Sequence, residues 1–330
     1  MIQGTWRSPG NIEEHLMATV RVTPGPPRVQ IQTQSGCNGR CVFCPNEATL
    51  KSGMPHGKMK PELFEKIIAD LAKTPPRRIS LYLMNEPLLD KRLPEFVRHT
   101  TERIPSTTTF VTTNGTYLKP ERAEALIDAG LKRLKVSLQS LDPERNKAIM
   151  GYSSEKVIDN ILGVRRIIKA KCAKKFDFRV SMVVTRDNEK EVEEARRFWK
   201  SHGVRLVTSA LENRGGNIAI AQDMNPHEMR VRGDCIRPSR EMCILFNGEV
   251  VLCCVDWYRT VVLGNVGEQS VQEIWHSPRL QEVREALREN CPNCKPDICV
   301  NCSDSAQPNY HRRGLKGFVS RLFGVKQPVA

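Results

Sequence analysis

Three cysteines in one short segment are the residues of this chain best suited to redox chemistry. Cys37, Cys41 and Cys44 have the spacing C-x3-C-x2-C. Three thiolates at this spacing can hold three irons of a [4Fe-4S] cube, which normally has four thiolate ligands. The fourth iron then has an open position, and an open position on a metal is where chemistry takes place. A zinc site is the alternative, but its closed form needs a fourth ligand, and His56 is the nearest candidate.

The twelve cysteines are grouped along the chain, and the grouping indicates metal binding. Eleven of them lie in the segments 37–44 and 235–302, while Cys172 stands alone and has no assigned role. No apolar run approaches the ~18 residues of a membrane span, and residues 1–7 lack the layout of a signal peptide. We therefore expect a cytoplasmic protein, whose thiols stay reduced rather than forming disulfides.

The chain is basic, with a net charge of +14 from 51 Lys and Arg against 37 Asp and Glu. Such a charge suits nucleic acid, a membrane surface or an anionic small molecule. Nucleic acid is disfavoured, because only 6% of residues are aromatic and no aromatic-and-basic binding motif is present. Basic pairs such as Lys132-Arg133 are interpreted as parts of solvated helix faces.

Between about residues 28 and 210, short β-rich runs alternate with amphipathic helical runs. The predicted strands are 29–32, 79–83, 109–112, 134–138, 178–184 and 204–207. One predicted helix opens at Pro120 and closes before Gly130, the usual placement of these residue types. Six alternations predict a parallel sheet with helices outside, two repeats short of a closed (β/α)8 barrel. Because active sites lie at the carboxyl ends of such strands, the cysteine loop after the first strand is expected there.

Beyond about residue 211 the alternation ends, and the cysteine-rich segment 235–302 follows. Within it, Asn247-Gly248 stands between two short apolar runs, which is a strong hairpin signal. We expect this hairpin to bring Cys243 on one strand close to Cys253 on the other.

The last residues, 311–330, contain five basic residues, no acidic ones, and apolar residues at helical spacing. This pattern predicts a basic amphipathic helix that contacts a membrane or an acidic partner. An ordinary docked or frayed C-terminal helix explains the pattern equally well.

Taken together, the cysteine loop and the six-fold strand–helix pattern resemble the radical S-adenosylmethionine (radical SAM) superfamily. The distal cysteines resemble its SPASM/twitch subgroup. The resemblance implies an α/β fold, a partial (β/α)6 TIM-like barrel with a small cysteine-rich C-terminal domain. It divides the chain into an N-terminal extension (1–27), a radical SAM core (28–210), an auxiliary iron–sulfur domain (211–302) and a basic amphipathic tail (303–330).

In that family, SAM binds the open iron through its amino and carboxylate groups, and its reductive cleavage gives a 5′-deoxyadenosyl radical. The cofactors break the bond, while the protein supplies position and excludes water. The resemblance therefore implies SAM, one SAM-binding [4Fe-4S] cluster and one or two auxiliary clusters. It also implies an electron donor of the flavodoxin or ferredoxin type.

Five residues are candidate contacts to SAM by this resemblance. Phe43 would shield the cluster and adenine, and Glu86 would offer its carboxylate to the methionine ammonium. Asn114, Ser137 and Gln139 follow or end strands, where family members often place polar groups near the ribose. The alternatives are loop packing for Phe43, a solvated loop position for Glu86 and turn formation for the others.

One departure from the family occurs immediately before Glu86. Met84 and Asn85 stand where the family usually has two glycines. The charge that the contact with SAM requires is kept, and Pro87 fixes the backbone behind it.

The distal cysteines resemble the SPASM/twitch pattern, without the cysteine that ends the full SPASM pattern after Cys302. By family topology, the first auxiliary cluster would use Cys235, Cys243, Cys253 and Cys302. A second cluster would begin with Cys291, Cys294 and Cys299, completed by Cys254, another ligand or an open position. The split is left open because C-x2-C pairs often bind one cluster together, and a zinc ribbon is the alternative for the whole segment.

Two further residues are candidates for chemistry on a substrate. Asp256 follows the Cys253-Cys254 pair and would serve as the base that takes a proton from a substrate radical. A turn aspartate is the alternative. Arg214, after the sixth strand, would bind a substrate anion or cap a loop.

These observations predict a radical SAM enzyme that abstracts hydrogen from an unactivated carbon. The substrate is expected to be a small molecule such as a sugar or aminocyclitol, because only 36 residues precede Cys37 and leave little room for a leader-peptide-binding domain. The enzymatic alternatives are a peptide-modifying or lipid-modifying radical SAM enzyme. The competing class is a non-catalytic iron–sulfur or zinc protein that transfers electrons or binds nucleic acid.

Overall fold

A computed structural model gives the structure of residues 22–173, 175–229, 231, 235–291 and 293–303. In this part of the chain, nine strands form one curved sheet in the order β6-β5-β4-β3-β2-β1-β7-β8-β9. The strands are β1 (Arg28–Ile31), β2 (Arg78–Ser80), β3 (Thr108–Thr113), β4 (Arg133–Ser137), β5 (Asp177–Val184), β6 (Arg205–Ala210), β7 (Glu241–Ile244), β8 (Glu249–Val251) and β9 (Val262–Asn265).

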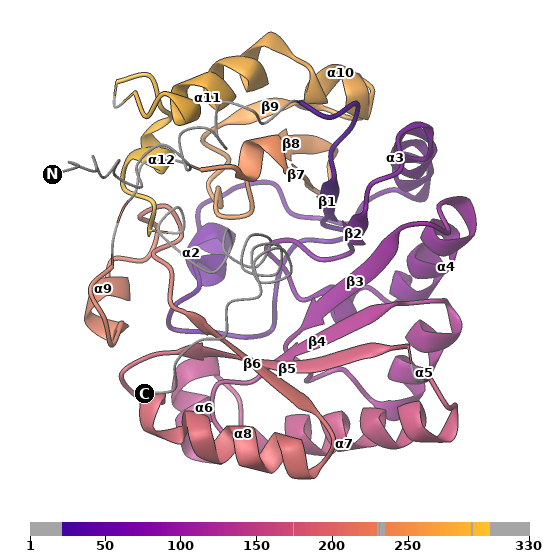
Figure 1. Ribbon diagram of the computed structural model, residues 1–330, viewed down its shortest axis with the longest axis vertical. Coiled ribbons are helices and arrows are strands. Elements are labelled where there is room, and N and C mark those ends of the chain that lie inside the picture. Colours follow the sequence, from indigo (N-terminus) through magenta and orange to yellow (C-terminus); the bar gives the residue numbers. More distant parts are fainter. Residues whose placement is uncertain (1–21, 174, 230, 232–234, 292, 304–330) are drawn as a thin grey trace, which may run out of the picture.

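The six predicted strands are confirmed as β1 to β6, with ends that differ by at most three residues. They are all parallel, with pairs such as Val29↔Ile79 and Val136↔Val180 in register. Helices cover the outer face of the curved sheet, and the sheet stays open, as Figure 1 shows. The expectation of a partial α/β barrel is therefore confirmed.

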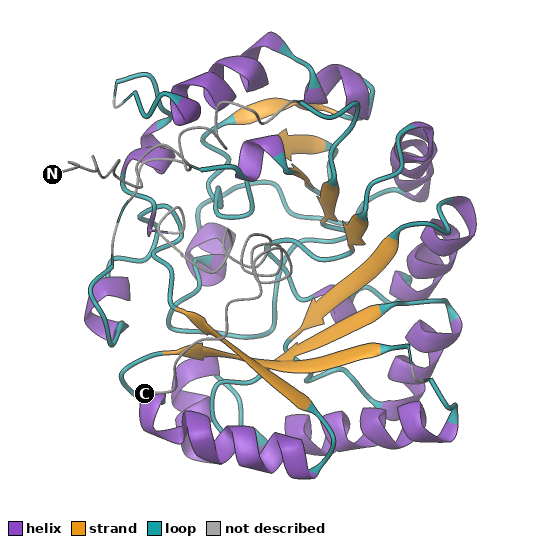
Figure 2. Ribbon diagram, viewed as in Figure 1, coloured by secondary structure: helices purple, strands orange, loops and turns teal. Residues whose placement is uncertain are grey.

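The helices of the barrel follow the strands in sequence, and the five longest pack their apolar stripes on the outer face of the sheet. They are α2 (Asn46–Lys51), α3 (Pro61–Lys73), α4 (Leu93–Arg103), α5 (Pro120–Asp128), α6 (Pro143–Met150), α7 (Glu155–Ala170) and α8 (Val192–Ser201). As predicted, α5 begins at Pro120, and Gly130 follows its end with a φ of +90°, a conformation that favours glycine. Figure 2 shows mainly loops and the short α2 on the concave side, where a site can form.

Strand alternation decides which side chains face the helices and which face the concave side. In β4, Leu134 and Val136 are fully buried in the core under the helices. Arg133, Lys135 and Ser137 alternate with them and are half-buried. Arg133 therefore belongs to the concave face of a strand, which corrects the interpretation of Lys132-Arg133 as a helix face.

The C-terminal part extends the sheet beyond β1. Strand β7 is parallel to β1, and the hairpin β7–β8 pairs Cys243 with Val251, so the predicted hairpin is confirmed. Helices cover this end (Figure 1), namely α10 (Val271–Trp275), α11 (Pro278–Arg288) and α12 (Asp297–Val300). The short helix α9 (Ala221–Met224) lies elsewhere, where its Met224 carbonyl accepts a bond from Arg186 N after β5.

Among the described residues, none of the helices has both the length and the apolar character needed to cross a bilayer. The predicted amphipathic helix at 311–330 lies outside the described residues. The proposed boundaries at 27, 210 and 302 remain predictions.

Candidate active site

The three-cysteine loop begins directly after β1 and is fixed by backbone hydrogen bonds on two sides. Gly36, with a φ of +91°, turns the chain out of the strand, and its carbonyl accepts a 2.9 Å bond from Glu86 N. On the other side, Arg40 N and Val42 N donate to the carbonyls of Met150 and Ile149 at 3.0 Å. The loop is thus held between the segment after β2 and the end of α6.

The three thiols face one another closely enough to interact electrostatically. Burial raises the pKa of Cys37 to about 11, and burial followed by the neighbouring Cys44 and Cys37 raises the pKa of Cys41 further. Burial also raises the pKa of Cys44. Thiolates this close repel one another unless a cation lies between them, and bound iron reverses that cost. The geometry therefore fits a shared metal cluster.

Glu86 is buried and holds three segments together through its carboxylate. Its Oε1 accepts bonds from Leu88 N (3.0 Å) and Thr113 Oγ1 (2.6 Å), and its Oε2 accepts one from Asn114 N (2.7 Å). Burial raises the pKa of Glu86 to about 7, against the effect of these donors. An ionised carboxylate has about four acceptor sites, so one remains for a ligand. The alternative considered for Glu86, a solvated loop position, is wrong because the side chain is buried, while its contact with SAM remains a prediction.

Asn114 joins the cysteine loop to this arrangement. Its amide nitrogen Nδ2 donates to Asn38 Oδ1 at 2.8 Å and approaches Cys37 Sγ at 3.8 Å. Its carbonyl accepts a 3.3 Å bond from the hydroxyl of Tyr152, whose pKa is raised by burial and then by the nearby Cys41. Asn114 therefore lies beside Cys37, and its contact with SAM remains a prediction.

The other candidate SAM contacts lie at the carboxyl ends of the strands with different surroundings. Ser137 Oγ is half-buried and lies 3.5 Å from Ser181 Oγ on β5. Gln139 is buried and its Oε1 accepts a 2.6 Å bond from Val183 N, which ties β4 to β5. Phe43 is buried against Ile149 and other apolar residues. Gln139 therefore links two strands by a hydrogen bond, and Phe43 packs in an apolar cluster. The contact of either residue with SAM remains a prediction.

Met84 and Asn85, the two residues that stand where the family usually has glycines, differ in what is unusual about them. Met84 has a φ of +51°, where glycine is favoured. Asn85 Oδ1 accepts a 2.9 Å bond from Leu83 N, while its Nδ2 is buried and has no hydrogen-bond partner among the described residues. Buried polar groups normally have partners. An unused donor beside the cysteine loop fits the binding of a polar cofactor such as SAM.

Arg214 lies at the same end of the sheet, after β6. Its φ is +53°, and its guanidinium is 3.3 Å from Glu212 Oε2. Its positive charge opposes the rise in the pKa of Cys41 and Cys44, which places it near the loop. Arg214 therefore lies near the loop, paired with Glu212, and its contact with a substrate anion remains a prediction.

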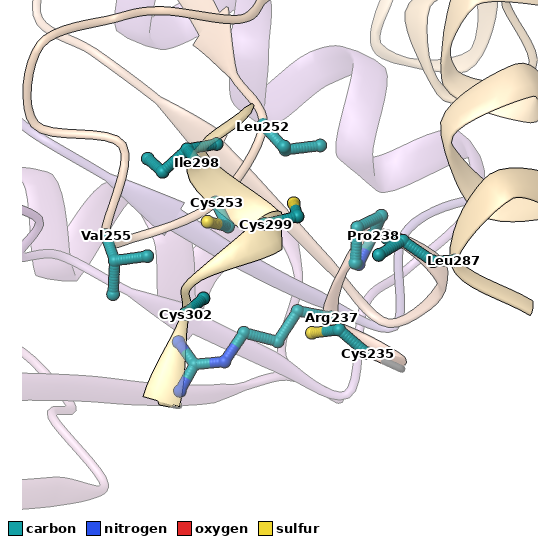
Figure 3. Close-up of a pocket in the computed structure, with 10 residues that line it drawn as sticks. All are labelled: Cys235, Arg237, Pro238, Leu252, Cys253, Val255, Leu287, Ile298, Cys299 and Cys302. Atoms are coloured by element: carbon teal, nitrogen blue, oxygen red, sulfur yellow. The ribbon is translucent and has the colours of Figure 1, made fainter. Parts of the chain in front are cut away.

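A second group of cysteines lines a pocket in the C-terminal part (Figure 3). Cys235, Cys253, Cys299 and Cys302 surround it together with Arg237 and apolar side chains. Burial, followed by the neighbouring Cys235 and Cys302, raises the pKa of Cys299 to about 12. Four thiols in one pocket match the ligand set of a [4Fe-4S] cluster.

This pocket differs from the expected split of the distal cysteines. Cys299, expected in the second cluster, lines the pocket, while Cys243, expected in the first, does not. Cys243 lies within β7, packed against Leu83 and Val251, although it is near enough to Cys253 to raise the pKa of that thiol. The hairpin forms as predicted, but Cys253 falls beyond the end of β8.

The remaining C-x2-C pair also differs from expectation. Cys291 and Cys294 are joined in a disulfide, rather than standing as two free ligands. The two residues follow the end of α11, and the spacing lets one short turn bring their sulfur atoms together. No second complete set of four thiols is found in the part of the chain that the structure describes.

Asp256 is a turn residue in the structure. Its carboxylate is fully buried and accepts bonds from Thr260 N and Oγ1, both at 2.8 Å, and from Val261 N at 3.0 Å. With these partners it stabilises the turn that follows the cysteine pair. The structure thus shows the turn role that was considered for Asp256, and its role as a catalytic base remains a prediction.

The number of thiols in each of the two cysteine groups is compatible with an iron–sulfur cluster. No group of three or more Cys, His, Asp or Glu side chains within the described segments is arranged around a single metal ion. A cube spreads its ligands over separate irons. The loop can hold three irons and leave one open, and the pocket can hold four.

Comparison with known proteins identifies the family. The radical SAM superfamily pattern matches residues 31–199, and the pattern of an iron–sulfur cluster-binding SPASM domain matches residues 235–303. The chain belongs to the radical SAM superfamily and carries a SPASM domain.

Two curated relatives are similar in sequence. The chain is 27% identical over 277 residues, 84% of its length and 92% of the relative's, to S-adenosyl-L-methionine-dependent 2-deoxy-scyllo-inosamine dehydrogenase of Niallia circulans. It is 32% identical over 182 residues, 54% of each chain, to GTP 3′,8-cyclase of Aquifex aeolicus. Among solved structures, BtrN in complex with AdoMet and 2-DOIA matches with a TM-score of 0.59 at 26% identity, covering 83% of this chain and 92% of that one.

Membership of this family defines the class of protein. It is an enzyme of the oxidoreductase type that uses SAM, contains [4Fe-4S] clusters and needs a reductant. The non-catalytic iron–sulfur and zinc alternatives are wrong.

Two residues near the site were not identified from the sequence. Tyr152 gave no signal, because a tyrosine after a helix is common. Lys135 did give one, since a charged residue alternates with apolar ones in a strand of a parallel sheet, which is normally apolar on both faces.

Proposed function

We propose that this enzyme oxidises an alcohol carbon of a small polyhydroxylated molecule, such as a sugar or cyclitol, to a carbonyl. The observation that carries the proposal is the presence of two different cysteine groups, a three-thiol loop and a four-thiol pocket. The relative that matches over nearly its whole length is named a dehydrogenase of an inosamine.

In this proposal, different residues bind the two clusters and SAM. Cys37, Cys41 and Cys44 hold the SAM-binding cluster, and the pocket cysteines hold an auxiliary cluster. Asn85 Nδ2 donates to a polar group of SAM, and Glu86 keeps its remaining acceptor site for the ammonium. When bound, SAM and the clusters supply a radical that removes a hydrogen atom from carbon, and an acceptor for the second electron.

The oxidation balances without a further oxidant. One hydrogen atom and one electron leave the carbon, the hydroxyl proton goes to solvent, and the C–O single bond becomes a C=O double bond. A flavodoxin or ferredoxin is the proposed reductant, and the cytoplasm is the proposed location. Buried thiols around the pocket keep water away from the auxiliary centre.

Anaerobic reconstitution tests this function. The protein is loaded with iron and sulfide, reduced with dithionite and incubated with SAM, and 5′-deoxyadenosine is measured by liquid chromatography. We expect slow release without substrate, and faster release with a matching polyol together with one carbonyl product per 5′-deoxyadenosine.

Three results would contradict the proposal in different ways. If protein loaded with its full set of clusters does not cleave SAM, the whole proposed function is wrong. Cleavage accelerated only by a peptide replaces the small molecule with a peptide substrate. Cleavage accelerated by a polyol without a carbonyl product replaces oxidation with rearrangement.

A further inference from the structure

Lys135 is a charged side chain within the barrel that the SAM chemistry does not use. It lies near the middle of β4, on the concave face, between the buried Leu134 and Val136 of the opposite face. Its Nζ lies 6.0 Å from the ring centroid of Phe110 on β3. A strand with parallel neighbours on both sides is normally apolar on both faces, so a lysine at this position is unusual.

Lys135 has no ionic or hydrogen-bonded partner among the described residues. The ion pairs around it join Arg28 and Arg78 to Glu241, Arg133 and Arg179 to Asp177, and Arg214 to Glu212. These pairs set three carboxylates against five arginines, and Lys135 takes part in none of them. The concave face near Lys135 therefore carries a surplus of positive charge.

The surroundings of Lys135 make this surplus costly to the folded protein. Burial, and then the positive charges of Arg214 and Arg78, lower the pKa of Lys135 to about 8, with Glu212 acting in the opposite direction and Arg179 in the same one. A half-buried lysine in the barrel whose charge has only the ring of Phe110 as a described partner is ordinarily avoided. Retaining a cation against this cost is explained when an anion from outside the chain completes the site.

The position of Lys135 relates it to the reactive end of the barrel. Arg214 influences the pKa of Lys135 and also those of Cys41 and Cys44, so it is near both the lysine and the loop. Lys135 also precedes Ser137, a candidate SAM contact, by two residues on the same face. Lys135 and Ser137 therefore share the concave face of β4, and Arg214 is near enough to act on the lysine.

We propose that Lys135, together with Arg214, binds an anionic oxygen group of the substrate, a phosphate or a carboxylate. This inference rests on the proposed function and narrows it, because it selects an acidic or phosphorylated polyol over an aminocyclitol whose amine is positively charged. A cation in a low-dielectric site attracts the anion and repels the amine.

The test compares three probes on the reconstituted, SAM-loaded protein by isothermal titration calorimetry. The probes are myo-inositol 1-phosphate, glucuronate and 2-deoxy-scyllo-inosamine. We expect at least one of the two anions to bind more tightly than the amine, and the tighter anion identifies the group as phosphate or carboxylate. If neither anion binds more tightly than the amine, the inference is overturned.

Variants assign the effect to the lysine. Lys135→Met should weaken binding of the preferred anion about thirtyfold or more, since it removes one partner of a buried charge pair. Lys135→Arg should keep most of the binding. Lys132→Met, at an exposed position three residues earlier, should change nothing. Equal anion binding by Lys135→Met and the unchanged protein would overturn the inference.

Two readouts separate this inference from its alternatives. Lys135→Met should fold normally, because it removes a buried charge, and thermal unfolding checks this. Its affinity for SAM should be unchanged, and a loss of SAM binding with anion binding intact would assign Lys135 to SAM and overturn the inference. Because SAM cleavage without substrate is measured on the same preparations, failure of the proposed function is seen separately.

Discussion

The two cysteine groups are built in different ways, and the difference explains what each can do. Cys37, Cys41 and Cys44 come from one loop, fixed by Gly36 and by the end of α6. The pocket takes its thiols from three places that are far apart in the sequence, near 235, 253 and 299–302. A single loop supplies three ligands and leaves a position for chemistry, whereas an assembled pocket supplies four and closes the cluster.

The largest expected effect comes from removing one thiol of the loop. Cys37→Ala should lower SAM cleavage by more than about 100-fold, since losing a ligand exceeds the 10–100-fold typical of changes around a ligand. The auxiliary cluster should remain, because its ligands lie elsewhere. Cleavage is measured as 5′-deoxyadenosine and cluster content as iron per protein. Persistent SAM cleavage, or loss of all iron, would contradict the claim that the loop and the pocket hold separate clusters with separate roles.

The second effect tests which cysteines form the pocket. Cys299→Ala should remove one cluster's iron, because Cys299 lines the pocket. Cys243→Ala is the matched control, and it should keep that iron and lose only about 1 kcal/mol of stability from the small cavity. The reverse pattern, with iron lost from Cys243→Ala alone, would restore the ligand split expected from the sequence.

Sequence reasoning succeeded where the information was local. The six strands and the loop were predicted, because buried parallel strands are apolar runs and the loop spacing lies within eight residues. The set of cysteines that lines the pocket was not predicted. Whether Cys243 or Cys299 lies beside Cys253 in the pocket depends on the path of the chain after α11.

The roles of two carboxylates show the same limit. Glu86 and Asp256 looked like solvent-facing or reactive groups in the sequence, yet both are buried and hydrogen-bonded to backbone nitrogens. Their partners, Asn114 and Val261, become neighbours only through the turn or strand that each carboxylate stabilises. Long-range packing and turn geometry decided both cases.

A smaller effect, on stability, is expected from changing Glu86, whose backbone nitrogen and carboxylate connect the cysteine loop to its neighbours. Glu86→Gln places an amide where Asn114 N, Leu88 N and Thr113 Oγ1 need an acceptor, so the free energy of unfolding should fall by about 1–3 kcal/mol. Chemical denaturation of the protein measures this. Unchanged stability with weakened SAM binding would show that Glu86 acts on the ligand alone.

The smallest expected effect is a pH dependence of anion binding at Lys135 in the barrel. Lys135, with a pKa of about 8, is charged below that pH and loses its proton above it. Binding of glucuronate, if it is the preferred anion, should therefore weaken about tenfold between pH 7 and pH 9, well below the usual lysine range near 10.4. If myo-inositol 1-phosphate is preferred, it replaces glucuronate in this titration. Affinity that stays constant to pH 9 would contradict a role for Lys135.

The response of the clusters to SAM tests the central claim most directly. Electron paramagnetic resonance spectra of the reconstituted, dithionite-reduced protein are recorded with and without SAM, for the natural sequence and for Cys299→Ala. SAM should shift the signal of one cluster only, and that signal should survive in Cys299→Ala. A spectrum indifferent to SAM, or a SAM-sensitive signal that disappears with Cys299, would contradict an open iron in the three-cysteine loop.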